Sequence, residues 1–222
     1  KGNYAFALSA LNQALKYDAK NPSVQNLLGD VNVIKGQDKD AIENYKKAIA
    51  LKKDYAEVYY KLGRLYRNTN MHESIKYFKE YLNNGFATLD CNNNEFISDE
   101  ILNFTKCHPY YTQQLAFHYW NALKDTNNTT VDEVIEKLIQ QHDIDYERLW
   151  MTLNLMDRKL LIELSQKEIS GSSDKKNRQI PESTRYSAYK RLLNNGFLIQ
   201  LNRTYTIEDP FFIKWLIKRR DV

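Results

Sequence analysis

The first third of the chain repeats with a period of 34 residues. Four pairs of small residues stand at this separation: Gly2 and Gly36, Ala7 and Ala41, Ala14 and Ala48, Gly29 and Gly63. This period suits a unit of two antiparallel helices, and each such unit buries its apolar face only against its neighbours. Small residues fit where two helices cross closely, and larger residues fill the remaining space. The repeat therefore predicts stacked helical hairpins and a mainly α fold.

The third unit is expected to be the last one. Its turn is one residue short, and bulky Tyr81 stands where the pattern calls for a small residue. At the other end, residues 3–20 match only the second helix of a unit. A lone second helix cannot bury its apolar stripe, so we expect the chain to be a fragment of a protein that continues upstream.

Over residues 1–83, the in-phase glycines and alanines resemble the tetratricopeptide repeat, and the repeats are predicted to occupy residues 1–84. The resemblance implies a right-handed superhelix whose concave groove binds a peptide or a segment of a partner protein. Helices that only space or stiffen would give the same pattern, so both interpretations stay open. A groove that holds a carboxylate needs amide and cationic side chains, which helical phase offers at Asn26, Lys61, Arg64 and Asn68.

A polar linker is predicted over residues 85–97, because the Asn-Asn-Gly triplet at residues 83–85 forms a helix stop. Oxygen-bearing side chains alternate, as in a calcium-binding loop, at Asp90, Asn92 and Asn94. That loop needs Gly where Glu95 stands and a bidentate Glu where Ile101 stands, so no metal site is predicted. Ser98 is expected to cap the helix that follows.

Three segments of the back half carry a second resemblance. They are residues 97–123, which read ISDEILNFTKCHPYYTQQLAFHYWNAL, residues 146–155, which begin YERLW, and residues 209–216, which read DPFFIKWL. In order and spacing they resemble the lid and winged helix of the archaeal-type ATPases, in the signal-transducing multidomain (STAND) branch of the AAA+ fold. The resemblance implies a helical lid-like subdomain over residues 98–154 and a winged-helix domain over residues 155–222.

The lid of that family carries a Gly-x-Pro motif that contacts bound nucleotide, and Cys107, His108 and Pro109 stand in its place. The resemblance thus implies that His108 and Pro109 sense a nucleotide. A structural role explains the same residues, since Pro is well placed in the first turn of a helix. We favour the structural role, because no nucleotide-binding core accompanies these residues.

The chain is predicted not to be an enzyme. No glycine is followed by lysine, as a phosphate-binding loop requires. No apolar strand ends in a pair of carboxylates that would hold magnesium. We therefore predict no catalytic residues and no cofactor in this chain; ATP enters only if a core domain exists elsewhere in the native protein.

The predicted winged helix has helices over residues 157–165 and 181–194 and strands over residues 197–201 and 204–207. Basic side chains suited to DNA lie on the second helix and at the wing tip: Arg185, Lys190, Arg191 and Arg203. The net charge of +4 is mild for a nucleic-acid binder. We therefore favour a solvated face, or a surface that packs on a partner, over DNA binding.

Composition places the chain among soluble proteins. The mean hydropathy is −0.66, and no apolar run approaches the roughly 18 residues of a membrane span. The only cysteines, Cys91 and Cys107, favour a reducing compartment, so a cytoplasmic location is expected. Trp120, Trp150 and Trp215 fall on apolar faces and are expected in the core.

The leading hypothesis is a non-catalytic protein-interaction or scaffolding module. Its repeats would bind a partner protein or peptide, and its winged helix would regulate or dock. The alternative is a regulatory fragment of an ATP-binding signalling ATPase, and a DNA-binding regulator is less favoured. No membrane partner is expected.

Overall fold

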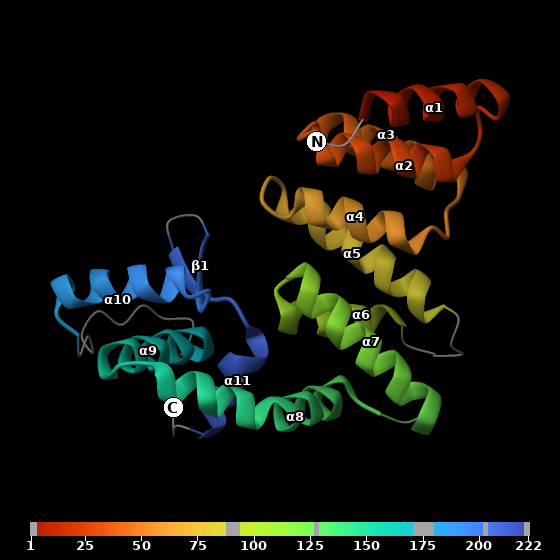
Figure 1. The fold of residues 1–222 in the computed structure, drawn as a ribbon. Coiled ribbons are helices and arrows are strands. Elements are labelled where there is room, and N and C mark those ends of the chain that lie inside the picture. The colour runs from red at the N-terminus through yellow and green to blue at the C-terminus, as the bar shows by residue number, and fades with distance from the viewer. Residues whose placement is uncertain (1–3, 88–93, 127–128, 171–179, 202–203, 220–222) are drawn as a thin grey trace. The chain divides into compact units, whose positions relative to one another are not determined.

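The computed structural model describes residues 4–87, 94–126, 129–170, 180–201 and 204–219. This described part is helical apart from its turns and one two-stranded sheet, which confirms the predicted fold class (Figure 1). The chain divides into two compact units, Lys1–Trp120 and Asn121–Val222. The boundary lies inside a helix, within the range 98–154 that the sequence assigns to one lid-like subdomain.

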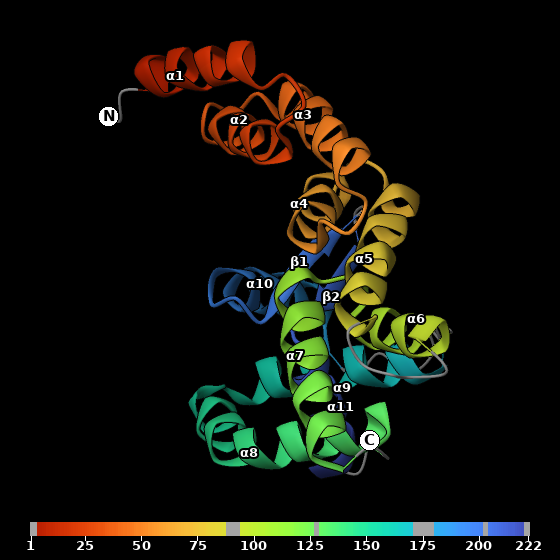
Figure 2. The ribbon, with the colours of Figure 1, turned by 90° about the vertical axis from the view of Figure 1, so that its right-hand side faces the viewer.

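The first unit begins with helices of the repeat region. In chain order they are α1 (Tyr4–Tyr17), α2 (Pro22–Ile34), α3 (Asp38–Leu51), α4 (Ala56–Tyr66) and α5 (Met71–Phe86). Helices α2 and α3 form one hairpin and α4 and α5 form the next, and the hairpins follow one another along the unit (Figure 2). The predicted pairs of helices are thus present.

Glycine lets the two helices of each hairpin approach closely. A Cβ atom at Gly29 would lie 2.3 Å from Cε1 of Tyr45, and one at Gly63 would lie 2.9 Å from Cδ1 of Phe78. Both rings therefore occupy space that any other residue would fill. Ala41 and Ala48 are fully buried, which confirms that these recurring alanines lie at the helix crossing, while Gly36 lies in the turn after α2 with a φ of 73°.

The helix stop predicted at residues 83–85 is wrong, because α5 continues through Gly85 to Phe86. Leu82 and Phe86 are buried, and this packing outweighs the cost of about 1 kcal/mol that a glycine imposes inside a helix. Tertiary contacts thus override the local signal, and part of the predicted linker is helical.

The predicted cap at Ser98 is also wrong. Helix α6 (Asn94–Thr105) begins before it, and Ser98 lies buried inside the helix. Its hydroxyl donates to Oδ1 of Asn83 over 2.7 Å, so Ser98 joins α6 to α5. The remaining positions of the rejected calcium loop, Asp90 and Asn92, lie outside the described residues.

Helix α7 (Pro109–Thr126) follows, and its residues up to Trp120 belong to the first unit. Thr105 and Thr112 share a hydrogen bond of 2.8 Å between their hydroxyls, and the ring of Phe86 meets that of Tyr119 edge to face. These contacts attach α6 and α7 to the repeat helices. The first unit therefore extends well beyond residue 84.

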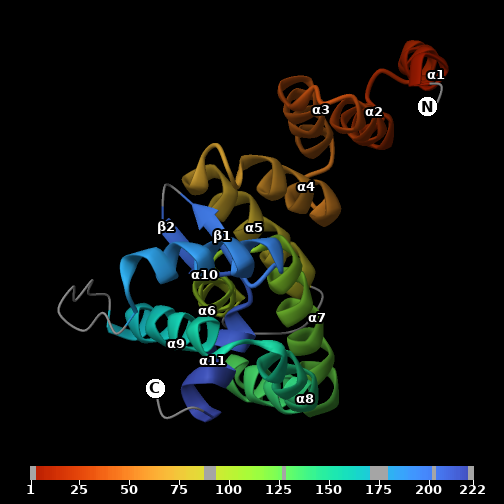
Figure 3. The same ribbon diagram turned by 60° about the vertical axis from the view of Figure 1, so that its left-hand side comes forward.

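The second unit contains α8 (Val131–Thr152), α9 (Leu155–Ser170), α10 (Glu182–Asn194), β1 (Leu198–Leu201), β2 (Thr204–Ile207) and α11 (Pro210–Arg219). The strands pair antiparallel, with buried Leu198 opposite buried Ile207. Helices α9 and α10 lie side by side (Figure 3). The order of helix, helix and hairpin is the one that the sequence predicts, and α11 follows the hairpin.

Helix α11 packs on α8 and α9 and completes the core of this unit. Trp215 is fully buried, and its indole N–H donates to Oδ1 of Asp143 over 2.8 Å. Trp150 is buried as expected, but Trp120 is only half-buried. The expectation of a core role is therefore wrong for Trp120.

Candidate interaction site on the helical repeats

A groove with a volume of about 470 Å³ lies between α2 and α4 and reaches α3, and we call it the repeat groove. Its lining residues are Asp30, Val33, Ile34, Tyr45, Lys61, Arg64 and Leu65. Val33 and Ile34 are exposed on α2, in the last turn before Gly36. Two of the predicted partner-binding residues, Lys61 and Arg64, therefore line one groove.

The amine of Lys61 is held at the floor of the groove by acceptors on α2 and on its own helix. It lies 2.9 Å from Oδ1 of Asp30 and 2.6 Å from Oε1 of Glu57. It also donates to Oδ1 of Asn26 over 2.9 Å. Burial alone would lower the pKa of Lys61, but the hydrogen bonds to Glu57 and Asp30 outweigh it and raise that pKa.

Asn26 and Tyr45 extend this polar network below the surface. Buried Asn26 donates through Nδ2 to the hydroxyl of Tyr55 over 3.1 Å. The hydroxyl of Tyr45 donates to Oδ1 of Asp30 over 2.6 Å. Burial and the hydrogen bond to Asp30 raise the pKa of Tyr45 far above its ordinary value, so this phenol stays protonated. These hydrogen bonds join Asn26 and Asp30 of α2 to Tyr45 of α3, to Tyr55 and to Lys61 of α4. The network therefore ties α2 to α3 and α4.

Arg64 differs from Lys61 although it lines the same groove. Its side chain is exposed, with the guanidinium carbon 5.9 Å from the centre of the Tyr60 ring. Within the described ranges, no carboxylate forms an ion pair with it. The remaining predicted residue, Asn68, is exposed in the turn between α4 and α5 and does not line the groove. The structure therefore brings together Asn26, Lys61 and Arg64 but not Asn68.

Sequence reasoning missed Asp30, Tyr45 and Glu57. Glu57 stands one helical turn before Lys61, which is a readable signal for an ion pair. Asp30 has no such signal, because it contacts Lys61 from the preceding repeat. The carboxylates matter because they neutralise the lysine that the sequence offers to a ligand.

Comparison with family models agrees with this geometry. Residues 29–69 match the model described as TPR repeat, and residues 56–83 match the model described as Tetratricopeptide repeat. Residues 29–83 are therefore similar to tetratricopeptide repeats. Such repeats are generally protein–protein interaction modules. No curated protein matches the chain.

The tetratricopeptide matches end at residue 83, so the ATPase resemblance of the back half stays a prediction. No helix within the described ranges combines the length and apolar character that crossing a membrane requires.

The predicted nucleotide-sensing residues, His108 and Pro109, lie where α6 turns into α7. Lys106 and Cys107 have φ of 50° and 56°, in the left-handed region that favours glycine. The N–H of Cys107 donates to the carbonyl of Leu102 over 3.2 Å, and Pro109 begins α7. Burial raises the pKa of the Cys107 thiol to about 11, so it stays protonated. The two positive φ values, the N–H of Cys107 and the position of Pro109 each serve a tight turn between helices.

Two of the predicted DNA-contacting residues are paired with carboxylates of α9, although only Arg185 is buried and Arg191 stays exposed. Arg185 forms a bidentate pair with Glu163 of α9, at 2.8 Å and 2.7 Å. Arg191 pairs with buried Asp157 of α9, at 3.2 Å and 2.6 Å. The hydrogen bonds to Glu163 raise the pKa of Arg185 further above its ordinary value.

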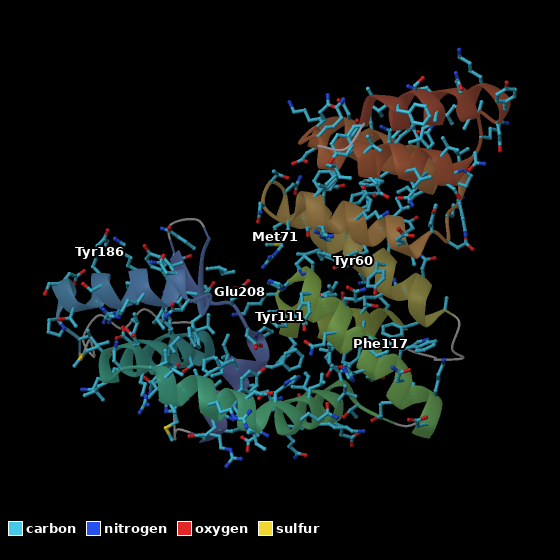
Figure 4. The ribbon with its side chains drawn as sticks, in the orientation of Figure 1. Tyr60, Met71, Tyr111, Phe117, Tyr186 and Glu208 are labelled. Carbon is cyan, nitrogen blue, oxygen red and sulfur yellow. The ribbon has the colours of Figure 1, made fainter. Side chains whose placement is uncertain are left out.

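The other two basic residues differ from this pair. Lys190 is exposed, and Arg203 lies outside the described residues. The outer side of α10 also presents Tyr186, which projects away from α9 (Figure 4). The arginines of α10 thus hold it to α9 rather than forming a basic surface.

Proposed function

We propose that the chain is a non-catalytic protein-interaction module whose repeat groove binds an extended segment of a partner protein. The observation that supports this is the composition of the groove. Exposed Val33 and Ile34 offer apolar contact, and Arg64 offers a cation that is not already neutralised. Exposed apolar side chains beside a charged rim are typical of interaction sites.

The ion pairs of Lys61 define which segment fits. Asp30 and Glu57 already form ion pairs with the amine of Lys61. A carboxylate of a ligand would therefore gain little binding energy from Lys61 and would be repelled by both negative groups. Arg64 is the better contact for a carboxylate, since a guanidinium binds it through two parallel hydrogen bonds. The proposed ligand therefore has an acidic residue beside apolar residues that contact Val33 and Ile34.

Selection of random peptides displayed on phage, with the full chain as bait, tests this proposal. Enriched peptides should place Asp or Glu next to apolar residues, and Arg64→Glu should weaken their binding at least tenfold, by about 1.4 kcal/mol. Lys47→Glu is the matched control, because Lys47 is exposed on α3 and does not line the groove. Equal loss in both variants, or enrichment of basic peptides, would contradict the proposal.

The second candidate is a regulatory segment of an ATP-binding signalling ATPase. The observation in its favour is the turn before α7, where Cys107 adopts a glycine-like φ in front of His108 and Pro109. The test is titration of the full chain with a fluorescent ATP analogue. Saturable binding that His108→Ala removes would support this candidate over the first.

A DNA-binding regulator is supported least, because Arg185 and Arg191 are held in ion pairs with α9. Binding to duplex DNA is measured at low salt, where phosphate contacts are strongest. We expect no binding to the duplex. Binding that falls steeply with added salt would instead support a DNA-binding regulator.

A further inference from the structure

A second groove in the first unit lies between α5 and α7 and has a volume of about 700 Å³. We call it the aromatic groove. Helix α5 contributes Tyr81 and Phe86, and α7 contributes Tyr110, Phe117 and Trp120. It shares no lining residue with the repeat groove.

The aromatic side chains of α7 lie on a face that the first unit leaves open. Tyr110 is 62% exposed and Phe117, labelled in Figure 4, is 59% exposed, while Trp120 is half-buried. They follow a helical spacing, whereas Leu115 and Tyr119 lie on the opposite, buried face of the helix. Helix α7 therefore has a buried apolar face and an exposed aromatic face.

The absence of charge distinguishes the aromatic groove from the repeat groove. None of its lining residues is Asp, Glu, Lys or Arg, although 27% of the chain is charged. Its polar groups are the hydroxyls of Tyr81 and Tyr110, the imidazole of His118 and the amides of Gln113 and Gln114. A charged ligand would lose its hydration here without gaining a partner of opposite charge. The occupant is therefore uncharged and carries hydrogen-bond acceptors.

An extended proline-containing segment meets these conditions. In polyproline II the backbone makes no internal hydrogen bonds, so its carbonyls remain open to donors such as amides and phenols. Its rings pack on aromatic grooves with little loss of entropy. The stripe from Tyr110 to Trp120 is about 15 Å long at 1.5 Å per residue. This length matches about five residues of polyproline II at 3.1 Å each.

We propose that the aromatic groove is a second docking site, which takes an uncharged, proline-containing segment of a partner protein in extended conformation. The occupant is a partner rather than this chain, since each of the four prolines of the chain stands at the start of a helix: Pro22, Pro109, Pro181 and Pro210. The proposal does not depend on the function of the repeat groove.

Gly85 provides a variant that fills the groove without harming the fold. It lines the groove from inside α5, and a Cβ atom there would meet no atom within 4 Å. Its φ is not positive, so a larger residue adds no backbone strain. Gly85→Leu should therefore occupy the binding space while favouring the helix.

The test uses the full chain labelled with 5-fluorotryptophan and observed by ¹⁹F NMR. Trp120 lines the groove, while Trp150 and Trp215 are buried in the second unit and serve as internal controls. The probe is a pool of uncharged ten-residue peptides with prolines at two fixed positions. We expect the Trp120 signal to shift on titration while the other two signals stay in place.

Three variants sharpen the result. Gly85→Leu and Phe117→Ser should each weaken the titration at least tenfold, and unchanged Trp150 and Trp215 signals will report an intact second unit. Phe117 is exposed, so Phe117→Ser should leave the core intact. It therefore tests the groove even if Gly85→Leu misfolds. Arg64→Glu should leave the titration unchanged, which separates this site from the repeat groove.

Three outcomes overturn the proposal. The first is no Trp120 shift at about 1 mM peptide, where even a weak complex of about −4 kcal/mol is half formed. The second is equal binding by peptides whose prolines are replaced with alanine, which would indicate a helical occupant. The third is a Trp120 shift on dilution alone, which would show that a second copy of the chain covers the groove.

Discussion

The two compact units hold their helices together in different ways. In the first, a glycine of one helix receives an aromatic ring of the next, as Gly29 receives Tyr45 and Gly63 receives Phe78. In the second, charged side chains bridge α9 and α10 through Arg185 and Arg191. The first arrangement occurs in both α2–α3 and α4–α5, at positions 34 residues apart, while the ion pairs of the second unit follow no such period.

The two kinds of contact lose stability under different substitutions. A close crossing fails when volume is added, because the ring above the glycine is buried and cannot move aside. A bridge between charges fails when one partner is removed, because the other is left buried without compensation.

The largest effect is expected for Gly29→Val. The added Cβ would lie 2.3 Å from the Tyr45 ring, and Tyr45 is fixed by its hydrogen bond to Asp30. We expect the variant to destabilise the α2–α3 hairpin by about 3 kcal/mol. Hydrogen exchange of the α2 and α3 amides, read by mass spectrometry, measures this local stability.

Gly85→Ala is the control for this variant, because the same addition meets no atom within 4 Å. It should raise stability by up to about 1 kcal/mol through helix propensity alone. If Gly29→Val were as well protected as the unmodified chain, the close crossing would not explain the recurring glycine.

A smaller effect is expected for Arg191→Met in the second unit. It leaves the buried carboxylate of Asp157 with only the amide of Asn154 as a side-chain donor among the described contacts. We expect a loss of about 2 kcal/mol. Urea unfolding followed by the fluorescence of Trp150 and Trp215 reports on this unit.

Removing the charge of Asp157 as well distinguishes the pair from simple packing. The double variant Asp157→Asn with Arg191→Met should recover more than half of the stability that Arg191→Met alone loses. The reason is that position 157 then carries no buried charge. No recovery in the double variant would mean that the stem of Arg191, and not its charge, stabilises α10.

The polar network of the repeat groove should matter less. Lys61→Met removes the cation between Asp30 and Glu57, but both carboxylates keep some contact with water. We expect a loss of about 1 kcal/mol, measured by hydrogen exchange in α2 and α4. Arg64→Met, which breaks no ion pair in the described structure, should leave the exchange unchanged. Equal effects would show that the network does not stabilise the repeats.

The repeat region could be predicted because each contact recurs. The period alone places Gly29, Ala41 and Ala48 at crossings, and helical phase places Lys61 and Arg64 in one groove. It does not supply Asp30 as the partner of Lys61, since that contact joins different repeats. The sequence therefore predicted where the groove lies but not that its lysine is neutralised.

The rest escaped prediction because single contacts leave no pattern. Burial of Leu82 and Phe86 carries α5 through Gly85, although the local signal ends the helix. The face of α10 that carries Arg185 is decided by Glu163, which lies 22 residues earlier. One sequence shows which residues are charged but not which charges meet, so the arginines were predicted to face outward.

The smallest predicted effect concerns Asp209, which precedes α11 and accepts hydrogen bonds from Tyr146 and from the N–H groups of Phe211 and Phe212. Burial raises the pKa of Asp209 above 3.8, and these hydrogen bonds only partly oppose it. The native state therefore keeps this proton to a higher pH than the unfolded state. The unfolded state then binds fewer protons, so stability must fall as pH rises through this window.

Asp209→Asn isolates this effect, because its amide oxygen still accepts the hydrogen bonds. The stability of the unmodified chain minus that of the variant should fall by about 1 kcal/mol or less as pH rises from about 4, and then level off above the native pKa. Urea unfolding at several pH values measures it. Tyr146→Phe removes one donor and should steepen the fall, whereas a difference that grows with pH would show that hydrogen bonding outweighs burial at Asp209.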